Sequence, residues 1–149
     1  MGFVRSLAWR SRDGEPMQET QQQSLVAGNG FSVEPGRARR RGVTLLSLES
    51  WREACQELGT ELPWHTRRAN ILVEGIPLAS TIGSVLKIGD VMVHVHGETK
   101  PCGIMDQAHP GLRTALSSDF RGGVHGEVLT GGLVAVGDGI QIMPGPQPE

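Results

Sequence analysis

Short apolar runs separated by glycine-containing turns dominate the hydrophobic pattern of this chain. Runs of this length that are rich in valine, leucine and isoleucine are typical of buried strands. Several turns between them carry Gly-Asp or Gly-Gly pairs, which suit tight connections between antiparallel strands. The pattern predicts strands at 3–9, 43–46, 71–73, 85–88, 91–96, 124–129, 133–136 and 140–143.

Residues 85–96 predict a hairpin whose two strands are joined by the turn Gly89-Asp90. Along the second strand, three valines alternate with Met92, His94 and His96. Successive side chains of a strand point to opposite faces, so the two histidines are expected to share one face and the valines the other.

A helical period replaces the strand pattern after residue 46. Apolar residues recur at helical spacing between an N-cap residue and a glycine stop, namely Ser47, Leu48, Trp51, Cys55, Leu58 and Gly59. Because Cys55 lies on the apolar stripe, we interpret it as a small core residue. A second, shorter helix is expected at 112–116, just after Pro110.

The two ends of the chain are the least regular parts. Residues 1–42 are expected to form an irregular N-terminal part, in which 17–36 is a long polar loop. The basic run 37–41 is interpreted as a solvated loop, with an anion site at the barrel mouth as the alternative. The proline-rich tail 144–149 is expected to be frayed.

Many short strands with regular turns, and one or two short helices, favour a mainly β barrel or sandwich over a parallel α/β sheet. The 149 residues fit one domain, 1–149. Tyrosine is absent and aromatic residues make up only 4% of the chain, so the core must rest on valine, leucine and isoleucine.

Charge and hydropathy limit the classes of binding partner that we expect for this chain. A net charge of −2 predicts no general attraction to nucleic acid or to anionic membranes. No stretch approaches the ~18 apolar residues of a membrane span, and 1–8 lacks the apolar core of a signal peptide. We therefore expect a cytoplasmic protein with free thiols.

Cys102 is the main candidate for chemistry. It stands in a polar segment, 97–106, between Pro101 and Gly103 and two residues after Lys100. A loop cysteine near a cation can be stabilised as the thiolate, which attacks sulfur, binds metals or carries a persulfide. From this local context alone, a functional thiol and an unreactive loop cysteine are equally supported.

A second candidate is the pair His94 and His96. Two histidines at i and i+2 on one strand face can share a zinc ion, and Cys102 is close in sequence. Since the sequence places no second cysteine or carboxylate at ligand spacing, we favour solvent-facing histidines and keep the zinc site as the alternative.

Several short segments resemble the MOSC family, named for the molybdenum cofactor sulfurase C-terminal domain. The family pattern Thr/Ser-Gly-x-x-x-Pro-Cys-x-x-x-Asp is similar to the stretch containing Gly97, Pro101, Cys102 and Asp106. Further similar segments follow in family order: 43–47 (VTLLS), 68–76 (RANILVEGI), 82–89 (IGSVLKIG), 121–124 (RGGV) and 136–138 (VGD). Together these segments span about Arg41 to Ile142.

This resemblance implies a barrel-like fold and a role in sulfur handling or molybdenum cofactor chemistry. It implies that Cys102 carries sulfane sulfur or binds molybdenum. Lys100 would then favour the anionic thiolate, and Asp106 would orient the loop or transfer a proton, with a loop cap as the alternative.

The pterin phosphate of a molybdenum cofactor would be held by Arg68, Asn70, Arg121 and Gly122. The alternative for the arginines is a surface or loop-bracing role. The family sulfurase also carries a desulfurase domain that binds pyridoxal phosphate. This chain leaves no room for that domain, so we expect no pyridoxal phosphate binding here.

One departure from the family pattern leaves three functions open. The family's Gly-Asp motif is replaced here by Gly28-Asn29-Gly30. The first function is sulfur carriage or cofactor binding through Cys102, with a cysteine desulfurase as partner. The second is a binding module that has lost its site. The third is a molybdenum-dependent reductase component for N-hydroxylated compounds, which would need an electron-transfer partner.

Overall fold

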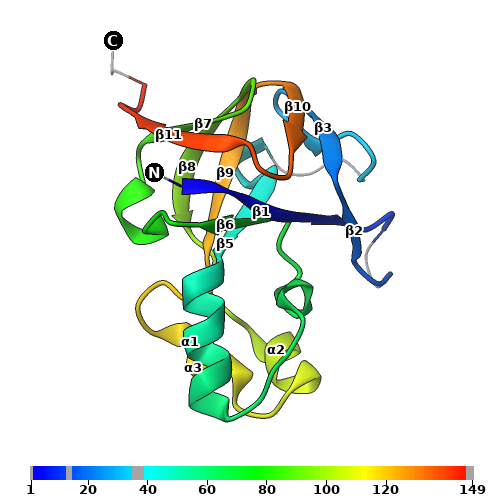
Figure 1. Cartoon of the computed structure of the whole chain (residues 1–149), viewed down its shortest axis with the longest axis vertical. Coiled ribbons are helices and arrows are strands. Elements are labelled where there is room, and N and C mark those ends of the chain that lie inside the picture. The colour runs from blue at the N-terminus through cyan, green and yellow to red at the C-terminus, as the bar shows by residue number, and fades with distance from the viewer. Residues whose placement is uncertain (1, 13–14, 35–38, 147–149) are drawn as a thin grey trace.

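The computed structural model describes residues 2–12, 15–34 and 39–146. Its barrel strands are β1 (Gly2–Trp9), β5 (Val43–Ser47), β6 (Ile71–Glu74), β7 (Val85–Ile88), β8 (Val91–Glu98), β9 (Val124–Thr130) and β11 (Gly139–Met143). Within the described ranges these seven strands run β11-β7-β8-β9-β5-β6-β1, and β1 pairs back with β11 to close the barrel. The mainly β barrel predicted from the sequence is confirmed (Figure 1).

Four shorter strands complete the β structure. β2 (Gln18–Thr20) lies beside β1 in the barrel sheet. A separate sheet in the order β10-β3-β4 is formed by β3 (Gln22–Val26), β4 (Gly30–Phe31) and β10 (Gly132–Ala135). The expected long loop at 17–36 is therefore wrong over half of its length. Besides β4, β3 pairs with β10, more than a hundred residues later, and a local pattern cannot reveal this pairing.

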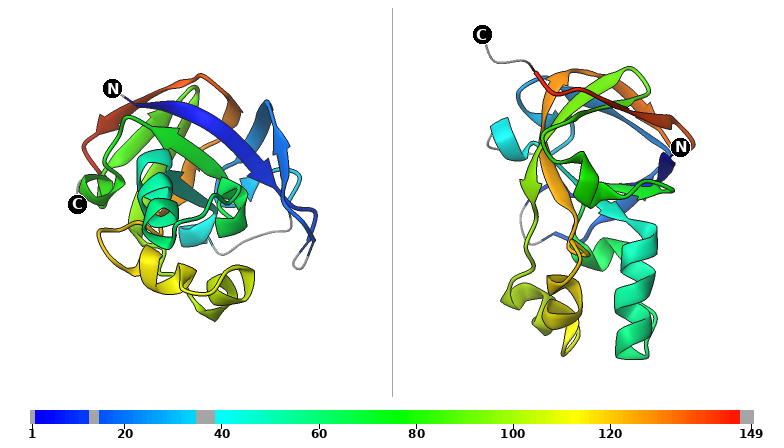
Figure 2. Two further views of the ribbon diagram at one scale, coloured as in Figure 1. Left: turned by 60° about the horizontal axis from the view of Figure 1, so that its bottom comes forward. Right: turned by 90° about the vertical axis from the view of Figure 1, so that its left-hand side faces the viewer.

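Within the described residues, the three α-helices gather at one end of the barrel, as the two views in Figure 2 show. They are α1 (Leu48–Leu58), α2 (Gly103–Ala108) and α3 (Leu112–Ser117), and the 3₁₀ helices are η1 (Arg39–Arg41), η2 (Trp64–Arg67) and η3 (Leu78–Thr81). The structure confirms α1 and α3. The polar segment 97–106 is not a loop throughout, because β8 continues to Glu98 and α2 begins at Gly103.

Two apolar cores hold the molecule together. The first fills the barrel and consists mostly of valine, leucine and isoleucine, as predicted, with Phe31 added. The second lies between the helices and the barrel end and contains Trp51, Cys55 and Trp64. Cys55 is thus confirmed as a core residue. The hairpin 85–96 is also confirmed, with Val91, Val93 and Val95 fully buried.

Three expectations reach residues that the structure does not describe. Residues 147–149 of the expected frayed tail, 37–38 of the basic run and 35–36 of the polar loop lie outside the described ranges. In the part of the chain that is described, no helix has both the length and the apolar character required to cross a membrane.

We predict that Ser47→Ala lowers the free energy of unfolding by about 1 kcal/mol. The Ser47 hydroxyl accepts a hydrogen bond from the backbone N–H of Ser50 at 3.2 Å, and this satisfies one free donor at the start of α1. Urea denaturation should show the loss, while Gln56→Ala on the exposed face of the same helix should change little. An unchanged midpoint for Ser47→Ala would contradict the capping role.

Candidate functional site

Cys102 lies at the junction between the barrel and the helical end. It is the residue before α2, has extended backbone angles (φ −128°, ψ −176°), and makes no side-chain cap to the helix. Its side chain is exposed, whereas the preceding Pro101 is buried. The backbone is therefore anchored while the thiol remains open to other molecules.

Arg67 positions the segment before Cys102. Its guanidinium is buried and donates two hydrogen bonds to backbone carbonyls, from Nε to Gly122 at 3.0 Å and from Nη2 to Thr99 at 2.9 Å. A side chain at Gly122 would meet the Thr99 oxygen at 2.5 Å, so only glycine allows this close approach. The two chain segments that flank the site are thus joined through one arginine.

The charges of Cys102, Arg67 and Arg41 interact. Burial lowers the pKa of Arg67 from its ordinary value, the negative charge of a Cys102 thiolate raises it, and the Arg41 guanidinium lowers it. An anionic sulfur at position 102 therefore lies within electrostatic range of a buried, fixed cation, and that cation in turn interacts with Arg41 of η1. Sequence reasoning passed over Arg67, although it directly precedes the Arg68-Ala69-Asn70 segment that carries the family resemblance.

Two other residues, Lys100 and Asp106, were predicted to act together with Cys102. Lys100 is exposed. The Asp106 carboxylate accepts a hydrogen bond from the backbone N–H of Arg113 at 3.0 Å, at the start of α3. This contact is the capping role named above as the alternative for Asp106. Proton transfer by Asp106 stays a prediction.

The predicted cofactor ligands are engaged within the protein. Arg68 donates to the Glu15 carbonyl, and Arg121 forms ion pairs with Glu53 and Glu57 of α1. Asn70 is fully buried, accepts from the Thr44 backbone and donates toward Glu34 and Ala8, all within the protein. Gly122 contributes its carbonyl to Arg67. The contact of these four residues with a cofactor stays a prediction.

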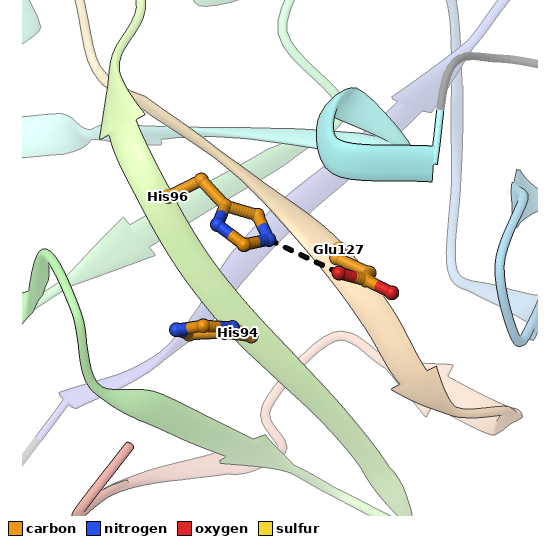
Figure 3. Close-up of side chains that lie close together, drawn as sticks. All are labelled: His94, His96 and Glu127. Carbon is orange, nitrogen blue, oxygen red and sulfur yellow. Dashed lines mark hydrogen bonds and ion pairs between the residues drawn. The ribbon is translucent and has the colours of Figure 1, made fainter. Parts of the chain in front are cut away.

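A second polar cluster lies on the outer face of β8 and β9. His96 Nε2 is 3.1 Å from Glu127 Oε1, and the His94 and His96 rings have centroids 4.3 Å apart. Figure 3 shows these three side chains drawn together from the two strands. Sequence reasoning had found no carboxylate for the histidine pair, because Glu127 belongs to another strand.

The basic run lies beside this cluster. Arg39 of η1 contacts Glu127 Oε2 at 3.4 Å. Burial lowers the pKa of His94, and the neighbouring His96 and Arg40 lower it further, while Glu127 and the Gly83 backbone raise it. Burial also lowers the pKa of His125, together with Arg41, His96 and Arg40. Part of the run is therefore in contact with the barrel face and not a purely solvated loop.

Some buried polar atoms near the site have no partner. Among the described residues, Thr99 Oγ1, His125 Nδ1 and Arg121 Nε are buried and form no hydrogen bond. Thr99 adjoins the Cys102 segment, and His125 lies opposite Gly97 in the β8–β9 pairing. Buried polar atoms of native proteins are nearly always satisfied, so each such atom calls for an explanation.

Comparisons with known proteins agree with this architecture. The MOSC domain model matches residues 26–141, more than half of the chain. Among solved structures, YuaD of Bacillus subtilis superimposes with a TM-score of 0.80 at 19% identity, covering 97% of each chain. YiiM of Geobacillus stearothermophilus gives 0.77 at 13% identity, covering 96% of this chain and 75% of that one.

YiiM of Escherichia coli gives a TM-score of 0.74 at 12% identity and covers 99% of this chain and 72% of its own. No curated protein sequence matches. At these identities the structural likeness establishes the fold alone, whereas the family match rests on the sequence. The chain therefore belongs to the MOSC domain family.

Proposed function

We propose that this protein carries sulfane sulfur on Cys102. The observation that supports the proposal is an exposed thiol three residues after Thr99, whose carbonyl the buried Arg67 guanidinium holds, within electrostatic range of that cation. A sulfur carrier must exchange with donor and acceptor proteins, which requires exposure. It must also hold an anionic sulfur, which a fixed cation stabilises.

The transfer proceeds without net oxidation when the donor is itself a persulfide. The Cys102 thiolate attacks the terminal sulfur of the donor, and a bond forms between Cys102 Sγ and that sulfur. The donor's S–S bond breaks and its inner sulfur leaves as a thiolate. The fixed cation of Arg67 opposes the negative charge on Cys102 before and after this exchange. Delivery to an acceptor thiolate reverses the same steps.

A second function, binding of a molybdenum-pterin cofactor, is favoured by a different observation. Thr99 Oγ1 and His125 Nδ1 are buried without a hydrogen-bond partner, and Thr99 stands three residues before Cys102, so both atoms remain available to a polar ligand that enters there. A thiolate is a suitable soft ligand for a metal such as molybdenum. Cys102 would hold the metal, and the residues expected to hold the anionic pterin phosphate are Arg68, Asn70, Arg121 and Gly122. The bound metal would supply oxygen-atom or electron-transfer chemistry.

The first function is tested by intact mass spectrometry of the protein after it has been exposed to a cysteine desulfurase that carries a persulfide. Wild type should gain about 32 Da, one sulfur atom, and lose it on reduction, whereas Cys102→Ser should show no gain. Cys55→Ala is the matched control, because its thiol is buried in the helical core. Sulfur gain by Cys102→Ser would place the carrier elsewhere.

Metal analysis after expression in a molybdopterin-competent host separates the second function. Stoichiometric molybdenum with pterin fluorescence, lost in Cys102→Ser, would support cofactor binding. Protein that holds neither sulfur nor molybdenum in both samples would contradict both functions and favour a binding module that has lost its site.

A further inference from the structure

Two neighbouring strands bring three metal-binding side chains together on the outer face of the barrel. His94 and His96 alternate along β8, and Glu127 of β9 is paired with His94 across the sheet. One potential ligand atom from each of the three residues lies within 4.8 Å of the others. In Figure 3 the His96 ring and the Glu127 carboxylate point toward one another across β8 and β9, and His94 lies beside His96 on β8.

We propose that His94, His96 and Glu127 bind a divalent transition-metal ion such as Zn²⁺. The proposed ligands do not include Cys102, and the proposal does not rest on the function proposed for that residue. Two imidazole nitrogens and one carboxylate oxygen form a ligand set that is well suited to zinc and to neighbouring first-row metals.

The geometry requires only small adjustments. Zinc binds nitrogen and oxygen at about 2.0–2.2 Å, so tetrahedral ligand atoms stand roughly 3.4 Å apart. The separation of His96 Nε2 and Glu127 Oε1 is 3.1 Å. The ligand atoms of the three residues lie within 4.8 Å of one another, so His94 has to close at most about 1.4 Å, which a rotation of its side chain can supply. A metal ion would take the place of the proton shared between His96 and Glu127.

The surroundings resemble the outer shell of a metal site. The side chains of His96 and Glu127 are only 9% and 15% exposed, so the ligands are sheltered from bulk water. Arg39 contacts Oε2 of Glu127, which leaves Oε1 free to face the metal while Arg39 orients the carboxylate. Three protein ligands leave one position open. The adjacent positive charges of Arg39 and Arg40 favour an anionic ligand there.

Isothermal titration calorimetry with Zn²⁺ tests the proposal. The titration uses the Cys102→Ser protein, so that the reactive thiol cannot bind the metal. We expect one Zn²⁺ per chain. His94→Ala and Glu127→Gln should each weaken binding at least about a hundredfold, because loss of a ligand should exceed the 10–100-fold effect of outer-shell changes. His109→Ala is the matched control, since His109 lies at the end of α2 in the helical end.

Two further measurements distinguish the loss of a metal ligand from misfolding of a variant. Thermal unfolding without metal should show that each variant retains the fold. Addition of Co²⁺ should give the visible absorption of a low-coordinate site in the Cys102→Ser protein and not in His94→Ala. Zinc binding that is unchanged by His94→Ala and Glu127→Gln, or no saturable binding by the Cys102→Ser protein, would overturn the proposal.

Discussion

Arg67→Met should lower the free energy of unfolding by about 3–5 kcal/mol, the range typical of removing one partner from a buried charged contact. Met fills most of the same volume but leaves the carbonyls of Thr99 and Gly122 without their donor. Each unsatisfied carbonyl carries a desolvation penalty of about 1–3 kcal/mol. The same change removes the fixed cation within electrostatic range of Cys102, so sulfur loading of Cys102 should fall at least about tenfold.

Arg68→Met is the matched control for this variant. It removes the same charge from the next residue, whose guanidinium donates to the carbonyl of Glu15, away from the two carbonyls that Arg67 holds. Arg67→Lys separates charge from position, because an ammonium keeps the cation but cannot reproduce the planar fork that reaches both carbonyls. Equal stability and equal sulfur loading for Arg67→Met and Arg68→Met would show that Arg67 has no special role at the site.

Most barrel strands were predictable because their signals are local. The hairpin 85–96 combines alternating valines with a Gly-Asp turn, and α1 combines an N-cap serine with a left-handed glycine at its end. β3 and β4 gave no such signal. Of their seven residues, only Leu25 and Phe31 belong to the barrel core. The strand conformation of β3 depends on pairing with β10, and that of β4 on pairing with β3, so both are decided by tertiary structure.

The candidate sites were predictable to different extents. Cys102 could be found from the residues around it. Arg67 was missed, because nothing in its neighbourhood indicates that its side chain crosses to Thr99 and Gly122, up to 55 residues away. The histidine pair was visible, but its carboxylate lies 31 residues beyond His96 on the next barrel strand. Spacing along the chain cannot show a ligand that only the strand register supplies.

Several residues that carry the family resemblance stabilise the barrel in this chain. At Gly123, where φ is +94°, a side chain would meet the carbonyl oxygen of Leu45 at 2.2 Å. Gly122 allows the contact with Thr99, and the Asn70 side chain joins β5, β1 and the segment that contains Glu34. The short motifs therefore encode close packing of backbones as well as any contact with a ligand.

Asn70→Ala should destabilise the protein by about 3–5 kcal/mol, since it breaks a buried polar network at several points. The Asn70 carbonyl accepts from the backbone N–H of Thr44 at 3.1 Å, and its amide donates to the Glu34 carboxylate at 3.2 Å and to the Ala8 carbonyl at 3.4 Å. The side chain is fully buried, so water cannot replace these partners without entering the core. Denaturant titration with constant m-value would measure the loss.

Asn70→Asp then shows whether the contact with Thr44 or the contact with Glu34 contributes more to stability. This variant keeps the oxygen that Thr44 needs but turns the donor that faces Glu34 into a second acceptor with negative charge. Two carboxylates in one buried site repel, so the folded variant should take up a proton more readily than the unfolded chain. The stability deficit of Asn70→Asp should therefore be largest near neutral pH and shrink as the pH falls, whereas that of Asn70→Ala should vary much less with pH. Parallel pH profiles for the two variants would show that the contact with Glu34 contributes little. A smaller deficit for Asn70→Asp would then measure the Thr44 hydrogen bond, which this variant keeps and Asn70→Ala loses.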